Sequence, residues 1–171
     1  MKKNFKQLLK NITTFIFDVD GVLTDGSVIM LPTGEQIVKT NIKDGYALQL
    51  AIKKGYKVCI ISGKKSEVLK IRLKELGIND IYLGITEKMD SFEDYLFSNH
   101  LKAEEIMYMG DDMPDYEVMQ KAGIAACPED AAEEIKAISI YISNKKGGQG
   151  CARDVIEQVM KVHGKWPVTR M

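Results

Sequence analysis

The run Phe15-Ile16-Phe17-Asp18-Val19-Asp20-Gly21-Val22-Leu23-Thr24-Asp25-Gly26 begins as an apolar segment and breaks abruptly into two carboxylates one residue apart. In an extended strand, side chains i and i+2 point the same way, so Asp18 and Asp20 are expected to face one spot at the carboxyl edge of a sheet. Ligands of open α/β sheets bind at this edge. Two like charges held so close need a cation or a shared proton, although Asp and Gly are also common turn residues after strands.

The composition predicts a single domain, residues 1–171, without a bulk electrostatic partner. Lys+Arg and Asp+Glu both total 24, which disfavours nucleic acid or an anionic membrane surface as a partner. No apolar run approaches the ~20 residues of a membrane span, and Met1 to Lys10 lacks the apolar core of a signal peptide. Three widely spaced cysteines and two distant histidines predict buried thiols in a reducing cytoplasm and no zinc site.

Short apolar runs alternate with amphipathic segments, which predicts an α/β fold: a Rossmann-like, doubly wound parallel sheet with helices on both faces. The expected strands are 14–17, 57–61, 81–83, 106–109, 124–126 and 140–142. The expected helices are 44–54, 66–76, 88–99, 114–121, 130–137 and 153–163. A β-hairpin at about 27–40, around a Pro/Gly turn, is expected to project over the carboxyl end of the first strand.

Polar side chains follow two further expected strands. Ser62 and Gly63 end the second strand, where the hydroxyl and a close backbone amide suit an anion, although a helix N-cap is the more ordinary explanation of these residues taken in isolation. Gly63-Lys64 is not a phosphate-binding P-loop, because the first glycine of that motif is missing. Lys88 stands at a helix start, where the helix dipole disfavours a cation. That cost indicates a use beyond the surface, such as neutralising a phosphate.

The fourth strand ends in three carboxylates, Asp111, Asp112 and Asp115, within five residues. Asp115 is explained by helix capping alone, whereas two adjacent aspartates behind an apolar run are harder to explain structurally. Together with Asp18 and Asp20 they predict an oxygen-rich site for a small hard cation, which suits Mg²⁺.

Taken in order, these four motifs resemble those of the haloacid dehalogenase-like superfamily. The resemblance implies that Asp18 is the nucleophile that forms an aspartyl-phosphate and that Asp20 is the general acid and base. Asp18, the backbone carbonyl of Asp20, and Asp111 would hold Mg²⁺, with Asp112 and Asp115 acting through water or by orienting Lys88. Ser62 and the amide of Gly63 would bind the phosphoryl oxygens. These roles agree with the need to screen a carboxylate that attacks phosphorus.

Neither gap between the motifs is long enough for the cap domain that covers most members, so the chain is expected to be capless. The finer resemblance is to the 3-deoxy-D-manno-octulosonate 8-phosphate phosphatases of lipopolysaccharide precursor synthesis. It rests on residues 18–26, 41–45, 110–112 and 147–154. The resemblance implies a homotetramer with shared active sites. Lys43, Lys64, Arg72 and Arg153 are candidate substrate contacts, although surface is the more ordinary explanation for Arg72. Lys64 stands where that family more often carries arginine, and lysine offers the sugar a point charge in place of arginine's bidentate fork.

Three alternatives remain open. The glycines within 147–150 are typical of a flexible loop at the start of a C-terminal tail, about 145–171, or of a mobile basic lid. The substrate is alternatively a nine-carbon sugar-acid 9-phosphate. In a different class, a receiver-like signalling domain also joins an acidic pair, an acceptor Asp and a Lys on a parallel sheet. In that arrangement the acidic pair opens the chain, whereas Asp111-Asp112 follows Lys88 here.

Overall fold

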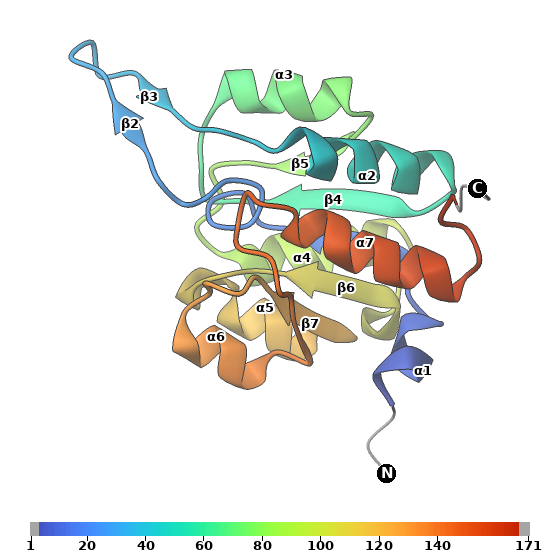
Figure 1. Ribbon diagram of the computed structural model, residues 1–171. Helices are drawn as coiled ribbons and strands as arrows, with labels where there is room; N and C mark the ends of the chain where they lie inside the picture. Colours follow the sequence, from blue (N-terminus) through green and yellow to red (C-terminus); the bar gives the residue numbers. More distant parts are fainter. Residues whose placement is uncertain (1–3, 168–171) are drawn as a thin grey trace.

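The computed structural model describes residues 4–167, and its centre is a parallel six-stranded sheet (Figure 1). The strand order is β5-β4-β1-β6-β7-β8, and each neighbouring pair is parallel. The strands are β1 Thr14–Phe17, β4 Lys57–Ile61, β5 Asp80–Tyr82, β6 Ile106–Met109, β7 Ile124–Cys127 and β8 Tyr141–Ile142. The expected strands are therefore confirmed to within a residue at either end. The strands β1, β4 and β6 lie in the middle of the sheet, where both faces are covered.

Helices cover both faces of the sheet, as the doubly wound fold requires. One face carries α1 Phe5–Leu9, α2 Ile42–Lys53, α3 Glu67–Glu75 and α7 Cys151–Val162. The other carries α4 Lys88–Ser98, α5 Tyr116–Lys121 and α6 Glu133–Ile138. Because strand side chains alternate, Phe15 and Phe17 pack into the first layer and Ile16 into the second. Two separate apolar layers therefore enclose the sheet, one on each face.

The hairpin projects from the body of the molecule, as the sequence predicts (Figure 1). Its strands β2 Ile29–Met30 and β3 Gln36–Ile37 are each only two residues long. Paired strand therefore occupies only a small part of the expected hairpin span of about 27–40. Most of its apolar side chains are exposed, so no core holds more of its length in strand form. The hairpin is the one part of the described chain that extends away from both apolar layers.

Several helix boundaries differ from those expected. The segment 114–121 divides into a 3-10 turn, η2 Met113–Asp115, and the short helix α5, because Asp112 caps the turn and Pro114 lies within it. The helix expected at 130–137 begins only at Glu133, since the amide of Ala132 donates to the carbonyl of Asp111, 2.9 Å away.

Two elements escape the sequence patterns. These are the five-residue helix α1 and the 3-10 turn η1 Ala103–Glu105, both too short to show an apolar period. Within residues 4–167, no helix combines the length and the apolar character that crossing a bilayer requires.

The segment expected to be a C-terminal tail is mostly part of the core. Helix α7 packs against α2, and its Val155, Ile156 and Val159 are fully buried. The helix begins at Cys151, two residues before the expected start, because Gly150 has the positive φ of +107° that ends the preceding turn. Residues 168–171 of the expected tail lie outside the described residues.

Candidate active site

The acidic motif lies where the strand β1 ends, at the carboxyl edge of the sheet. The amide of Asp18 still donates to the carbonyl of Met109, 3.1 Å away, and the Asp18 side chain is buried. Asp20 lies in the turn that follows, with its side chain 47% exposed. The strand ends at Phe17, so strand alternation does not place the two carboxylates in the way that the sequence pattern predicts. Both residues nevertheless line the same cavity, of about 390 Å³.

A buried lysine joins two of the carboxylates in this cavity. The ammonium of Lys88 lies 3.1 Å from Oδ1 of Asp18 and 2.7 Å from Oδ1 of Asp115, and its side chain is 4% exposed. Burial by itself would lower the pKa of Lys88, but the two carboxylates outweigh burial and raise it. Lys88 is therefore a permanent cation. Its two ion pairs offset the unfavourable position of a cation at a helix N-terminus.

Asp111 completes a cluster of three carboxylates. One oxygen from each of Asp18, Asp111 and Asp115 lies within 4.8 Å of the others. Burial, with Asp115 as the second cause, raises the pKa of Asp18 to about 7, and burial with Asp18 and Asp115 raises that of Asp111 to about 8. Three carboxylates thus face a single ammonium, which leaves an excess of negative charge.

This donor set fits a small divalent cation. Carboxylate oxygens at this spacing are ligands that Mg²⁺ accepts, and a cation would stabilise the charged carboxylates against both the burial and the repulsion that raise the two pKa values. The backbone makes room for the cluster at Gly21, where an added Cβ would lie 1.8 Å from Oδ2 of Asp111. Only glycine fits this close approach, and its φ is +77°. Of the expected metal ligands, the carboxylates of Asp18 and Asp111 are brought together, and the backbone carbonyl expected from Asp20 belongs to the turn that follows β1.

Asp115 and Asp112 differ more than their expected common role suggests. Asp115 is fully buried, and it accepts hydrogen bonds from Lys88 and from the amide of Asp111, 3.1 Å away. It makes no side-chain capping bond to α5, so the capping explanation is wrong. Asp112 is exposed and accepts from the amide of Met113 at 2.8 Å, which caps η2. Asp115 is therefore built into the ion-pair network, while Asp112 lies at the rim of the cavity.

The sequence patterns missed one member of the network, Tyr108 in the middle of β6. Its side chain is fully buried, and its hydroxyl donates to Oδ1 of Asp115 at 2.6 Å. Burial and the neighbouring Asp115 raise the pKa of Tyr108 well above its ordinary value, so the hydroxyl stays a donor. The only local signal was a phenol in a strand that is otherwise aliphatic or sulfur-containing.

The opposite wall of the cavity is formed by the turn after β4. Ser62 is buried, and its Oγ accepts from the amide of Lys64 at 3.2 Å. Lys64 in turn lies 3.7 Å from the carboxylate of Asp20. Ser62, Gly63 and Lys64 all line the cavity that Asp18 and Lys88 line. The predicted convergence of the four motifs on one cavity is therefore what the fold produces.

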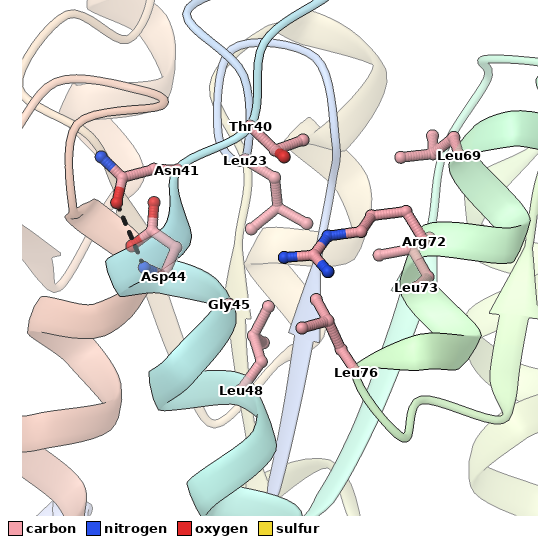
Figure 2. A pocket seen from close by; sticks show the side chains of 10 residues that line it. All are labelled: Leu23, Thr40, Asn41, Asp44, Gly45, Leu48, Leu69, Arg72, Leu73 and Leu76. Carbon is pink, nitrogen blue, oxygen red and sulfur yellow. Dashed lines mark hydrogen bonds between the residues drawn. The ribbon is translucent and has the colours of Figure 1, made fainter.

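Three of the expected substrate contacts lie elsewhere within this chain. Arg72 lines a small, mainly apolar pocket between α2 and α3, and Figure 2 shows its guanidinium reaching from α3 toward α2. Lys43 and Arg153 line a third cavity beside the start of α7, where Arg153 pairs with Glu157 at 2.7 Å. None of the three lines the cavity of Asp18.

Comparison with known proteins gives consistent matches. Residues 43–127 match the family model described as haloacid dehalogenase-like hydrolase. The 3-deoxy-D-manno-octulosonate 8-phosphate phosphatase KdsC of Escherichia coli K12 is 35% identical over 91% of this chain and 83% of its own length.

Solved structures of the same kind of phosphatase superpose closely. The Moraxella catarrhalis enzyme, in complex with magnesium ion, phosphate ion and a KDO molecule, has a TM-score of 0.89 and 33% identity, covering 92% of this chain and 90% of its own. The cobalt-bound Haemophilus influenzae enzyme has a TM-score of 0.89 and 31% identity, covering 92% of each chain.

Proposed function

This chain belongs to the haloacid dehalogenase-like hydrolase family, and on that premise we propose that it is an Mg²⁺-dependent phosphatase of 3-deoxy-D-manno-octulosonate 8-phosphate. The products are the free sugar acid and inorganic phosphate, and the reaction belongs to lipopolysaccharide precursor synthesis. The observation that carries the proposal is the ammonium of Lys88 held between Asp18 and Asp115 in the cavity that also holds Ser62. That arrangement suits a doubly charged phosphate approaching a carboxylate.

In the first step, a carboxylate oxygen of Asp18 attacks phosphorus. The new bond joins this oxygen to phosphorus while the ester bond between phosphorus and the sugar oxygen breaks. The departing oxygen takes a proton from Asp20, whose exposed position at the rim gives it access to the leaving alcohol. The hydroxyl of Ser62 and the amide of Gly63 donate to the phosphoryl oxygens and hold them in line.

In the second step, water attacks the aspartyl-phosphate. Asp20, now a carboxylate, takes a proton from this water, and the bond between phosphorus and Asp18 breaks to release phosphate. Lys88 balances the charge of Asp18 and the phosphoryl group through both steps. Asp115 keeps Lys88 in place, and Asp112 acts through water at the rim.

The metal site is assigned to Asp18, Asp111 and the backbone carbonyl of Asp20, with Asp112 and Asp115 supporting it. When bound, Mg²⁺ supplies positive charge at the phosphoryl group and at the attacking carboxylate. The three carboxylate oxygens within 4.8 Å of one another support this assignment. Burial first, and the neighbouring carboxylates second, raise the pKa values of Asp18 and Asp111, and a bound cation would offset both effects.

We place the enzyme in the cytoplasm as a homotetramer with shared active sites. The three cysteines are free thiols, which suits a reducing compartment. The hairpin exposes apolar side chains, including Ile29 at 55% and Met30 at 76%, that association between copies would bury. In such an assembly Lys43, Arg72 and Arg153 serve the substrate across a subunit boundary.

The experiment is phosphate release from a panel of phosphomonoesters, with Mg²⁺ or with EDTA. The panel contains the eight-carbon sugar-acid 8-phosphate, a nine-carbon sugar-acid 9-phosphate and ordinary hexose phosphates. The proposal predicts metal-dependent turnover with the eight-carbon substrate preferred. A preference for the nine-carbon substrate would show that the eight-carbon substrate assignment is wrong. Turnover in EDTA would refute the metal-dependent mechanism. The comparisons do not favour the receiver-like alternative, which would show phosphorylation without turnover.

A further inference from the structure

The glycine-rich segment before α7 is bound to the loop that carries the acidic motif. The amide of Gly148 donates to the carbonyl of Val22 at 2.9 Å, and the side-chain amide of Asn41 donates to the carbonyl of Gly148 at 3.3 Å. The amide of Gly147 donates to the carboxylate of Asp130 at 2.9 Å. These bonds tie the segment to three separate parts of the chain, whereas a flexible loop or a mobile lid would make few such contacts.

The contact between this segment and the acidic loop is too close for any side chain. A Cβ added to Gly147 would lie 1.9 Å from the carbonyl oxygen of Gly21 and 3.0 Å from that of Thr24. On its other side, Gly21 touches the carboxylate of Asp111, which an added Cβ would approach to 1.8 Å. The Gly21 backbone is therefore held between the glycine-rich segment and a carboxylate of the candidate metal site.

A buried carboxylate anchors the same segment from α2. Asp44 is 2% exposed, and its Oδ1 accepts from the amide of Arg153 at 2.9 Å, in the first turn of α7. Gly150, at the N-cap position, has no side chain to cap the helix, so Asp44 supplies the cap from another helix. Through Asn41 and Asp44, the start of α2 fixes the backbone from 148 to 153 against the acidic loop.

We propose that the segment Gly147–Gly148 is a positioning element of the active site. This proposal rests on the function proposed above. It fixes the backbone of Asp20 and Gly21 against Asp111, so that the metal ligands and the proton-transferring Asp20 keep their spacing. It touches neither substrate nor metal itself. A displacement of this backbone weakens metal binding and slows turnover while the two apolar layers stay intact.

The test is Gly147→Ala, with Gly123→Ala as the matched control. Neither glycine has a positive φ, and both face a backbone carbonyl, since a Cβ at Gly123 would lie 2.6 Å from the carbonyl oxygen of Glu104. Gly123 precedes β7, at the edge of the sheet opposite the site. In Gly147→Ala, the Gly21 oxygen must move about 1 Å to lie even 3.0 Å from the new Cβ. A misplacement of that size costs about tenfold to a hundredfold in kcat.

Three measurements are made on each variant: the calorimetric affinity for Mg²⁺ alone, amide hydrogen exchange at Gly148 without metal, and kcat with KM. Gly147→Ala is expected to bind Mg²⁺ at least about fivefold more weakly, exchange faster at Gly148 and lose kcat more than KM. Gly123→Ala should change only the melting temperature. Wild-type Mg²⁺ affinity in a folded Gly147→Ala protein, or equal losses in the control, would overturn the proposal.

A second pair of variants covers the case in which Gly147→Ala does not fold. Asp130→Ala removes the acceptor of the Gly147 amide, whereas Asp130→Asn keeps an oxygen in its place. The proposal predicts weaker Mg²⁺ binding for the first and recovery for the second; identical affinities in both would overturn it. Metal affinity and hydrogen exchange need no substrate, so they remain informative even if the substrate assignment fails.

Discussion

Replacing Tyr108 by Phe removes one hydroxyl beneath the active site and leaves the ring in place. That hydroxyl donates to Oδ1 of Asp115 at 2.6 Å, the same oxygen that Lys88 contacts at 2.7 Å. A buried hydrogen bond to a charged acceptor contributes about 1.5–3 kcal/mol, and Asp115 keeps two other donors, so we expect a stability loss of about 2 kcal/mol. For a chain of this length the melting temperature then falls by about 4–8 °C.

The same substitution loosens the carboxylate that holds Lys88 toward Asp18, so we expect kcat to fall about tenfold, with a smaller change in KM. The control is Tyr95→Phe. Tyr95 is equally buried, and its hydroxyl donates to a carboxylate oxygen of Asp80 at 3.2 Å, outside the site. It should lose stability and keep its kcat. Wild-type kcat in Tyr108→Phe, or an equal loss in Tyr95→Phe, would refute the positioning argument.

In the folded, metal-free protein, the pKa of Asp18 is raised to about 7 and that of Asp111 to about 8 from the ordinary value of 3.8. Between pH 5 and 8 the folded protein therefore holds protons that the unfolded chain has already released, so raising the pH over this interval should destabilise it. Mg²⁺ should therefore raise the melting temperature more at pH 8 than at pH 5, and an equal rise at both would contradict the metal assignment. At saturating Mg²⁺, Asp115→Asn should lower kcat about a hundredfold or more, whereas the exposed Asp112→Asn should lower it about tenfold or less. The reverse order would contradict the role of Asp115 in holding Lys88. Met30→Asp should lower the mass found by light scattering, and an unchanged tetramer would exclude the hairpin as the contact.

The sheet was predictable because its strands are apolar runs that end at polar residues. Phe17 before Asp18, and Met109 before Gly110 and Asp111, mark strand ends in the sequence itself. Parallel strands share one carboxyl edge, so these ends had to meet. The convergence of Asp18, Ser62, Lys88 and Asp111 on one cavity was predicted from these strand ends together with the order of the four motifs along the chain.

Other features depend on partners that are distant in sequence and leave no local period. Tyr108 looks like another core residue until Asp115 is seen beside its hydroxyl. Glycine is common in flexible loops, so the glycine-rich composition of residues 147–150 gave no sign that Gly147 packs against Gly21. Likewise, a basic residue such as Arg72 carries no sequence signal of which cavity its helix turns it toward (Figure 2).

The central claim is that Asp18 carries the phosphoryl group, and one trapping experiment tests it directly. In Asp20→Asn, an aryl phosphate still transfers its phosphoryl group, because the phenolate leaves without a proton, while hydrolysis of the intermediate lacks its base. After acid quenching, mass spectrometry should find one added phosphoryl group on the peptide that contains Asp18. A phosphoryl group on another residue, or rapid phosphate release by Asp20→Asn with none trapped, would contradict the account.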